Sequence, residues 1–473
     1  MSTNSIRKTV FVAMSGGVDS SVAAYLLKKQ SYNIVGIFMR CYNVDGCAER
    51  DAEDARRVAE HLKIPFYVWD FEEEYKKRVV DYMIEGYKNG ITPNPDVMCN
   101  KEIKFGLFFK KAFQMGAPAC RPASPKLKRG EQAEIYMATG HYVRLLKEKN
   151  VLSRNPAANL AWPPDGSRGQ IGEDKRGRRW SGRSGLRKEY FSLYQAKDKN
   201  KDQSYFLWTL TQEQLKHCLF PIGDYLKSEV REIARKAGLP TAEKKDSQGI
   251  CFLGKVALPD FLKQYIPEKK GAVLTTTGQK IGEHNGAHFY TIGQRHLNAN
   301  FQFPRLRLGL PDSVIKAGFG GQAISNFPKD GVKKDREPFY VAEKDTKTNT
   351  IVVAEGSDNP ALCKKEIELT NVNFINPNPY SNVLKNIRIG PGKSIIHNSE
   401  FIIPVMVRVR YRQPLAKAIL VGHRSSVISH KLIFEEPQKA VAPGQSAVFY
   451  FKNDSASVKT TADMEILGGG VIL

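Results

Sequence analysis

One segment near the beginning of the chain, SGGVDSS at residues 15–21, constrains the fold more than any other. It follows a short apolar run with β-branched residues, TVFVAM, and it precedes SSVAAYLLKKQ, in which apolar residues recur at helical spacing. Gly16 and Gly17 let the backbone pass close to a ligand, and the amides at the start of a helix favour an anion. The segment therefore predicts a strand, a phosphate-binding turn and a helix.

This turn lacks the lysine with which a Walker-type loop holds the β- and γ-phosphates of a nucleotide. Asp19 stands in the turn instead, and its carboxylate suits the Mg²⁺ that neutralises a pyrophosphate. Such a loop suits cleavage of ATP between the α- and β-phosphates, which leaves AMP on an acceptor. The alternative interpretation is a glycine turn that is capped by Ser and Asp and binds no ligand.

Strand-like and helix-like segments alternate through the first half of the chain. We expect strands at NIVGIFMR, PFYVWDF and IYMATGHYV, and helices at ERDAEDARRVAEHLKI and YKKRVVDYMIEGYKNG. Strands that alternate with helices at this pitch predict an α/β fold with a doubly wound parallel sheet. A stretch rich in Gly, Pro, Ser and Arg, residues 147–190, interrupts this order and is expected to be a disordered basic insertion.

The pattern changes near residue 337. Short strand-like runs such as PFYVAEKD, TIVVAEG, VMVRVRYR and SAVFYF follow one another without a long helix, which predicts a small antiparallel β-barrel. We therefore expect three domains. They are an α/β domain at 1–246, a small central domain at 247–335 that ends in a loop insertion at 301–335, and the barrel at 336–473.

Composition restricts the class of partner. The net charge of +23, from 72 Lys and Arg against 49 Asp and Glu, favours a polyanion such as nucleic acid or an anionic membrane surface. The alternative is a basic balance that only keeps the protein in solution. No apolar run reaches the roughly 18 residues that cross a bilayer, so we expect no membrane partner. The 7 cysteines are scattered without metal-ligand spacing, which argues against a zinc site and for a reducing compartment.

Two of these cysteines lie in polar segments. Cys99 ends the Pro- and Asn-rich run GITPNPDVMC, and Cys251 lies in KKDSQGICFLG. The prolines stiffen the first run, so that Asp96 and Cys99 are presented in a set direction, and Lys101 and Lys104 would favour a thiolate. For each cysteine taken alone, the alternative is a buried residue that acts as a small hydrophobe.

Nine blocks then occur in one order along nearly the whole chain. They are SGGVDSSVAAYLL, TPNPDVMCNKEIKFG, ATGHYVR, NKDQSYFL, DSQGICF, YTIGQR, VRVRYRQ, PGQSAVFY and GGGVI. Together they resemble the tRNA-specific 2-thiouridylases, a family of the PP-loop ATP-pyrophosphatase superfamily. The two insertions at 147–190 and 301–335 depart from this resemblance.

The resemblance implies a reaction that replaces the C2 oxygen of a wobble uridine in tRNA with sulfur. ATP would adenylate this oxygen, and the attack of sulfur would release AMP, giving 2-thiouridine, AMP and pyrophosphate. Cys251 would carry a persulfide, and Cys99 would be the partner thiol that leaves a transient Cys99–Cys251 disulfide. Asp96 would act as a general acid or base, so the implied catalytic residues are Cys99, Cys251 and Asp96.

The resemblance also implies three sets of contacts. The ATP contacts, made with Mg²⁺ and no other metal, are Ala13, Met14, Ser15, Gly16, Gly17, Val18, Asp19, Ser20, Met39 and Gly140. The contacts to the target base are Asn94, Pro95 and Asp96. The tRNA contacts are His141, Lys201, Asp202, Gln203, Arg410, Tyr411 and Gln445. Read without the resemblance, the RYR run on a strand is a solvated face, PGQ is an ordinary turn and His141 is a satisfied polar residue.

The implied partners are tRNA and a sulfur donor, either a relay protein or a cysteine desulfurase, and we expect a monomer. The basic insertion and the start of the chain, MSTNSIRKT, favour the mitochondrion; the alternative is a bacterial-type cytoplasm. Two other functions stay open. One is a different PP-loop enzyme, such as a ligase that amidates an adenylated carbonyl or a cytidine-modifying relative. The other is a non-catalytic RNA-binding protein.

Overall fold

The computed structural model describes most of the chain. The described residues are 8–42, 44, 46, 48–116, 134–149, 189–246, 256–295, 300–301, 337–376, 396–397, 400–423, 430–452 and 464–473. Cys251, the expected basic insertion apart from its two ends, and nearly all of the second insertion lie outside these residues. Within the described part, no helix is long and apolar enough to span a bilayer.

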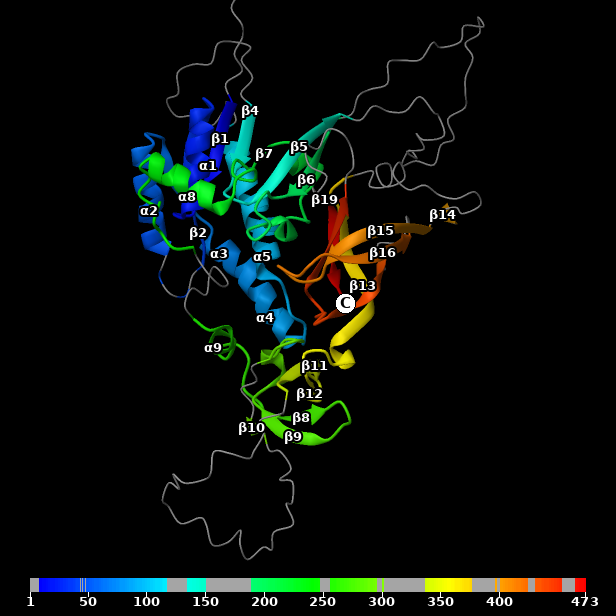
Figure 1. Cartoon of the computed structure of the whole chain (residues 1–473). Helices are drawn as coiled ribbons and strands as arrows, with labels where there is room; N and C mark the ends of the chain where they lie inside the picture. The colour runs from blue at the N-terminus through cyan, green and yellow to red at the C-terminus, as the bar shows by residue number, and fades with distance from the viewer. Residues whose placement is uncertain are drawn as a thin grey trace, which may run out of the picture.

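A five-stranded parallel sheet forms the core of the α/β domain, in the order β3-β2-β1-β4-β7 (Figure 1). Its strands are β1 (Lys8–Ala13), β2 (Asn33–Arg40), β3 (Phe66–Asp70), β4 (Glu134–Ala138) and β7 (Cys218–Leu219). Side chains alternate between the faces of β1: Val10 and Val12 enter one hydrophobic cluster, and Phe11 and Ala13 enter another. Both faces are therefore buried, which confirms the predicted doubly wound sheet.

Helices cover the two faces in two groups. The face of Val10 and Val12 is covered by α1 (Val18–Lys29), α2 (Ala48–His61) and α8 (Lys227–Lys236). The opposite face is covered by α3 (Glu72–Tyr75), a π-helical turn η1 (Lys76–Val80), α4 (Asp81–Lys88), α5 (Pro95–Met98), the π-helical segment η2 (Cys99–Phe108) and α6 (Phe109–Gly116). Apolar residues at helical spacing, such as Val79 and Met83, are fully buried on that side.

A second five-stranded sheet forms the central domain, in the order β10-β9-β8-β12-β11. Its strands are β8 (Gly271–Thr275), β9 (Lys280–His284), β10 (Asn300–Phe301), β11 (Phe339–Asp345) and β12 (Thr350–Glu355). β12 pairs with β8, and Val273 packs with Ile351 and Val353 in one cluster. This pairing corrects the expected boundary at 336, because β8 and β9 need the two later strands to bury their apolar face.

The C-terminal part is a closed antiparallel barrel of six strands, as predicted. Its strands are β13 (Cys363–Phe374), β15 (Glu400–Arg408), β16 (Ala416–His423), β17 (His430–Lys439), β18 (Ser446–Lys452) and β19 (Met464–Ile472). Pairing of β13 with both β17 and β19 closes the barrel. Along β15, Phe401 and Ile403 point into the core while Ile402 between them is exposed.

The α/β domain and the barrel share one continuous sheet. The hairpin of β5 (Val143–Lys149) and β6 (Glu189–Gln195) extends from the first domain, and β6 pairs with β19 of the barrel. The remaining elements are α7 (Gln212–Leu215), α9 (Leu258–Leu262), β14 (Ile396–His397) and the 3-10 turns η5 (Ser204–Phe206), η6 (Ala287–Phe289) and η7 (Pro360–Leu362).

A buried ion pair fastens this junction. Arg408 of the barrel donates to Asp202 at 3.0 Å, and Asp202 is 2% exposed. The same carboxylate accepts hydrogen bonds from the Gln195 side chain and the Ala196 amide, each at 3.1 Å. Both charges are therefore withdrawn from water, and each depends on the other.

Replacing Arg408 with alanine is expected to destabilise the protein by about 3–5 kcal/mol, because Asp202 would stay buried without its cation. The shift of the unfolding midpoint in urea measures this loss. Lys417→Ala, which removes one partner of an exposed pair with Glu435, is the matched control and should shift the midpoint little. Equal small shifts for both variants would contradict the assignment.

Candidate active site

The SGGVDSS turn runs from the carboxyl end of β1 into α1, and Gly16 lets it pass against α2. Gly16 has a φ of +72°, and a Cβ at this position would lie 2.2 Å from the carbonyl oxygen of Asp51. Any other residue would clash with the backbone of α2 and would strain the turn. The packing against α2 thus requires glycine at position 16, and the close approach of a ligand to Gly16 and Gly17 stays a prediction.

Serine hydroxyls fix the shape of the turn from inside. Ser20 donates to the Gly17 carbonyl at 3.1 Å and accepts from the Ser15 amide at 3.1 Å. Ser21 donates to the same carbonyl at 2.8 Å and accepts from the Thr241 hydroxyl at 2.9 Å. The backbone of the turn is thus held by its own side chains, which leaves the amides at the start of α1 for a ligand.

The other predicted ATP contacts lie around this turn. Gly140 follows β4 and lies against α1, since a Cβ there would be 2.7 Å from the Ser20 nitrogen. The strand expected at 135–143 ends at Ala138, and residues 139–142 form a loop at the edge of the sheet. Met39 lies within β2, one residue before its end. Strand ends of one parallel sheet edge therefore bring Gly140 and Met39 toward the turn.

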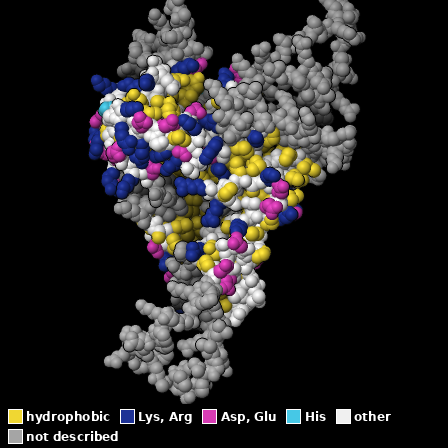
Figure 2. All heavy atoms as spheres, viewed as in Figure 1, with side chains coloured by type: hydrophobic (Ala, Val, Ile, Leu, Met, Phe, Trp, Pro, Cys, Tyr) yellow, Lys and Arg dark blue, Asp and Glu magenta, His cyan; other side chains and the backbone are white. Residues whose placement is uncertain are grey.

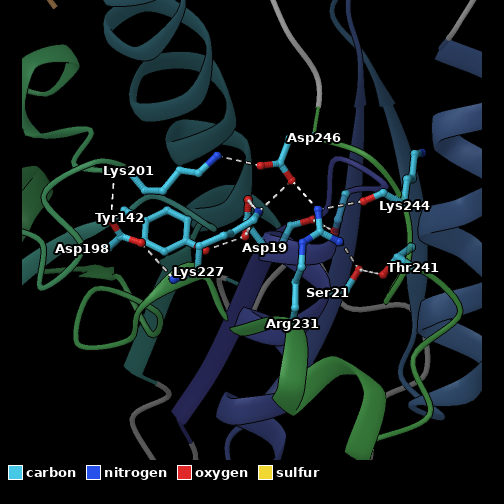
Figure 3. Close-up of polar contacts among 12 residues, drawn as sticks. Asp19, Ser21, Tyr142, Asp198, Lys201, Lys227, Arg231, Thr241, Lys244 and Asp246 are labelled. Atoms are coloured by element: carbon cyan, nitrogen blue, oxygen red, sulfur yellow. Dashed lines mark hydrogen bonds and ion pairs between the residues drawn. The ribbon is translucent and has the colours of Figure 1, made fainter. Parts of the chain in front are cut away.

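A network of charged side chains lies over the turn (Figure 3). Lys227, from the start of α8, donates to the two carboxylate oxygens of Asp19 at 2.7 and 2.8 Å and pairs with Asp246 at 2.9 Å. Tyr142 donates to Asp19 at 2.8 Å, and burial and the Asp19 charge raise the pKa of this phenol. Asp246 also pairs with Lys201 and Arg231, each at 2.8 Å. The turn lacks a lysine of its own, but a lysine from another helix, α8, lies beside it and pairs with Asp19.

Sequence reasoning missed this lysine. Lys227 lies 208 positions from Asp19, and no local pattern distinguishes it from the other basic residues of α8. Burial alone would raise the pKa of Asp246, but hydrogen bonds from Lys201 and Lys227 lower it to about 2. Asp246 is thus an anion at neutral pH, and it is the last described residue before the segment that carries Cys251.

Cys99, the predicted catalytic cysteine that the structure describes, begins the π-helical segment η2 directly after α5. The Asn94 side chain caps α5 by accepting from the Val97 amide at 3.2 Å. Cys99 is 4% exposed and packs in the hydrophobic cluster beneath the sheet. Long π-helical geometry is rare and is often found at functional sites. The pairing of Cys99 with Cys251 lies outside the described residues and stays a prediction.

Asp96 and His141 lie near one cation, Lys104. Burial raises the pKa of the Asp96 carboxyl, and the charge of Lys104 opposes this shift in part. Burial also lowers the pKa of His141 well below its usual value, and the same lysine adds to that shift. His141 is hydrogen-bonded to the Thr139 hydroxyl at 2.8 Å. At neutral pH this histidine is an uncharged, interior residue, so it supplies no cation for a phosphate.

The predicted tRNA contacts on the NKDQ run divide in the structure. Asp202 is a buried partner of Arg408, which does not support a direct contact by its side chain. Lys201 is partly exposed and paired with Asp246, and Gln203 accepts from the Tyr142 amide at 2.9 Å. A direct tRNA contact stays a prediction for Lys201 and Gln203.

The RYR run of the barrel lies in a turn after β15, and not on a strand as expected. β15 ends at Arg408, and Arg412 has a φ of +65°, which is not a strand conformation. Arg410 and Arg412 are exposed, whereas Tyr411 packs its ring 4.4 Å from that of Phe206. Lys and Arg side chains spread across this face of the α/β domain and along its border with the barrel (Figure 2). A basic surface of this kind suits a polyanion.

Comparison with protein families gives a match to three models that together span most of the chain. The tRNA methyl transferase HUP domain matches residues 8–170 and 179–255, the tRNA methyl transferase PRC-barrel domain matches 259–301, and the aminomethyltransferase beta-barrel domain matches 364–472. The α/β domain, part of the central sheet and the closed barrel correspond to these models in that order. No group of three side chains suited to a metal ion occurs in the part of the chain that the structure describes.

Curated relatives extend over the full length. The chain is 35% identical over 477 residues to the tRNA-specific 2-thiouridylase MnmA of Streptococcus thermophilus, covering 99% of this chain and 96% of that protein. It is 36% identical over 468 residues to the protein of the same name from Bacillus licheniformis, covering 98% and 94%. Among solved structures, NMN synthetase from Francisella tularensis aligns with 51% of this chain and 66% of its own at 12% identity and a TM-score of 0.26, too low to bear on the fold.

Proposed function

The chain belongs to the tRNA-specific 2-thiouridylase family, and we propose that it replaces the C2 oxygen of a wobble uridine in tRNA with sulfur at the expense of ATP. The observation that carries this proposal is the relationship at 35% identity over 99% of the chain. The PP-type turn at Gly16, the basic surface and the cysteine at the start of η2 agree with it. Each is a feature that ATP cleavage, tRNA binding or sulfur transfer requires.

In the proposed first step, residues 13–20, Met39 and Gly140 bind ATP so that the C2 oxygen of uracil attacks the α-phosphorus and pyrophosphate leaves. The start of α1 and the Lys227 ammonium group stabilise the charge of the departing pyrophosphate. Mg²⁺ carried by ATP would neutralise part of the phosphate charge. Asp19 and Asp246 suit that ion, because nucleotide-bound Mg²⁺ takes only one or two carboxylates from a protein.

In the proposed second step, a persulfide on Cys251 supplies the sulfur. Its terminal sulfur attacks C2 of the adenylated base, and the Cys99 thiolate then attacks the Cys251 sulfur. The sulfur–sulfur bond of the persulfide breaks, sulfur stays on C2, and AMP leaves with the former C2 oxygen. A thiol reductant then supplies two electrons to the Cys99–Cys251 disulfide. The donor that recharges Cys251 would be a sulfur-relay protein or a cysteine desulfurase.

Asp96 is proposed as the general acid or base of this step, beside the base contacts Asn94 and Pro95. Its raised pKa means that the carboxyl gives up and takes back a proton at a higher pH than an exposed aspartate. Its position three residues before Cys99, on the helical segment that Asn94 caps, places it on the same rigid element as the thiol.

The test is mass spectrometry of nucleosides from an unmodified tRNA that carries a wobble uridine, incubated with the protein, ATP, Mg²⁺ and a persulfide donor. We expect 2-thiouridine to form only when ATP is present. Cleavage of ATP to AMP without 2-thiouridine would favour another PP-loop chemistry. Binding of tRNA without any ATP cleavage would favour the non-catalytic RNA-binding protein.

Replacing Asp96 with asparagine is expected to lower the rate of 2-thiouridine formation by about 10²-fold and to raise the melting temperature at neutral pH. A carboxyl whose folded pKa lies above its unfolded value of 3.8 costs stability as the pH rises through that folded pKa. Asparagine carries no charge, so this cost disappears. Thermal unfolding should show a larger gain at pH 8 than at a pH near the unfolded value of 3.8.

The matched control for this variant is Asp81→Asn, which changes an exposed carboxylate paired with Lys76. It should leave both the thiolation rate and the melting temperature nearly unchanged. A lower melting temperature for Asp96→Asn than for the parent at pH 8 would contradict the buried, protonatable carboxyl.

We further propose that the protein acts as a monomer, and that it is mitochondrial, the latter on the basis of the basic insertion. Light scattering after gel filtration should give the mass of one chain. Fractionation of cells that express the tagged chain should place it with mitochondria, and recovery only in the cytosol would exclude this location.

A further inference from the structure

A turn of the barrel holds the segment that leads to Asp96 and Cys99. Residues 443–445, between β17 and β18, lie against residues 91–93, which precede α5. The Thr92 amide donates to the Pro443 carbonyl at 2.7 Å. The Gln445 side-chain amide donates to the carbonyls of Thr92 at 2.9 Å and Pro93 at 3.1 Å. Three hydrogen bonds thus join two domains at one short stretch of backbone.

Close packing on both sides restricts this stretch. Gly444 has a φ of +89°, and a Cβ there would lie 2.9 Å from the Thr92 carbonyl oxygen. On the other side, a Cβ at Gly86 of α4 would lie 2.8 Å from the Pro93 ring. Residues 92 and 93 are therefore packed between α4 and the barrel turn, and neither residue can shift without a clash on one side.

The turn is itself rigidly attached to the barrel. The Gly444 amide donates to the Ile472 carbonyl at 2.8 Å, and the Ile472 amide donates to the Gln445 carbonyl at 2.9 Å. The Tyr205 phenol donates to the Ser446 carbonyl at 2.9 Å and is also hydrogen-bonded to the Asn94 side chain. The barrel therefore provides a fixed reference for the segment that enters α5.

The orientation of the Gln445 amide follows from these contacts. Two carbonyl oxygens face the same side-chain atom, so that atom must be the nitrogen, and both of its hydrogens are used. Only the side-chain oxygen is left for any contact with tRNA. The expected contact with tRNA thus does not account for the two hydrogen bonds that the Gln445 amide donates within the protein.

We propose that Gln445 is a positioning residue, which sets the place of Asp96 and Cys99 by holding the carbonyls of Thr92 and Pro93. Two prolines and the Asn94 cap make residues 92–98 a rigid segment. A displacement of Thr92 would therefore also displace the Cys99 thiol. This inference deepens the proposed function and rests on it for its kinetic consequence. A 1 Å error in placing a reacting group costs up to about 10²-fold in rate.

The test compares Gln445→Ala and Gln445→Glu with the parent protein. The glutamate keeps the size of the side chain but places oxygens against the two carbonyls. Both variants should lower kcat for 2-thiouridine formation by about 10-fold or more at saturating ATP and tRNA, with a Kd for tRNA within about twofold of the parent. Hydrogen exchange of residues 91–98 and the alkylation rate of Cys99 should both increase, in the absence of tRNA and ATP.

Gln438→Ala is the matched control, because this glutamine lies on the same barrel and donates within its own strand, to the Glu436 carbonyl. It should change neither exchange at 91–98 nor kcat. Weaker tRNA binding with unchanged kcat and unchanged exchange would overturn the proposal and make Gln445 a tRNA contact. If the parent protein formed no 2-thiouridine and the variants still showed faster exchange, the proposed function would be refuted. The contact of Gln445 with residues 92 and 93 would then hold the segment without a role in thiolation. The proposal would also be overturned if the melting temperatures of the variants fell so far that unfolded protein at the assay temperature accounted for the whole loss of kcat.

Discussion

Replacing either Cys99 or Cys251 with alanine is expected to abolish 2-thiouridine formation, by more than about 10³-fold. The reason is chemical, since the proposed reaction needs one sulfur atom to carry the persulfide and a second to release it. Neither role passes to water or to a hydroxyl group. Mass spectrometry of nucleosides after incubation with ATP, Mg²⁺ and a persulfide donor measures the loss.

The two variants should differ in what they retain. Both should still bind tRNA and release pyrophosphate from ATP with AMP left on the base, because the ATP site is built from other residues. Cys251→Ala should accept no sulfur from a donor protein, whereas Cys99→Ala should accept it and fail to transfer it. Trapping with a thiol-specific alkylating agent distinguishes a persulfide from a thiol.

Cys363→Ala is the matched control, because this cysteine lies at the start of β13 in the barrel and is partly exposed. Thiolation at the parent rate is expected for it. If Cys99→Ala formed 2-thiouridine at the parent rate from a persulfide donor, the two-thiol reaction would be wrong, and Cys99 would be the buried hydrophobe that its 4% exposure also allows.

Replacing Lys227 with alanine is expected to lower kcat/KM for ATP by about 10²–10³-fold. Lys227 Nζ contacts Asp19 and Asp246, its side chain is 12% exposed, and it lies beside the turn that lacks a lysine of its own. An ammonium group in this place stabilises the charge that collects on pyrophosphate as it leaves. Its removal also leaves Asp19 without its cation, so that this carboxylate repels the phosphates, whereas Asp246 keeps Lys201 and Arg231.

Measurement of AMP release at varied ATP separates the two effects, since weaker binding raises KM and weaker stabilisation of pyrophosphate lowers kcat. Lys227→Arg should keep part of the activity because it keeps the charge. Lys236→Ala, at the other end of α8, changes a residue that is 76% exposed and paired only with Glu232 in the described contacts, and it should leave ATP cleavage unchanged. Parent-like kinetics for Lys227→Ala would show that the lysine only neutralises Asp19.

Local sequence was sufficient for much of the fold. The run of β-branched residues before Gly16, and the helical spacing after it, predicted β1 and α1 because both patterns depend on neighbours within a few residues. Short strand-like runs without a long helix between them predicted the barrel for the same reason. Pairing across insertions did not follow from such patterns, and the strands β11 and β12 were therefore placed in the wrong domain.

The candidate site divides in the same way. The turn at Gly16 was predictable because glycine readily adopts a positive φ, so its presence in the sequence indicates a tight turn. Asp202 was expected at the tRNA surface, but its charge is buried against Arg408 of the barrel. A charged residue has the same letter on a surface and in an ion pair, and only its distant partner decides between the two.

The sequence by itself determined the type of nucleotide loop, the class of each large domain and the presence of two cysteines in polar segments. Only the tertiary structure decided that Lys227 serves the turn and that Gln445 holds the segment before Cys99. The physical reason is distance along the chain. Turns, helices and strands are stabilised by neighbours, whereas these two contacts join residues 208 and 353 positions apart, and nothing but the packing of whole domains brings them together.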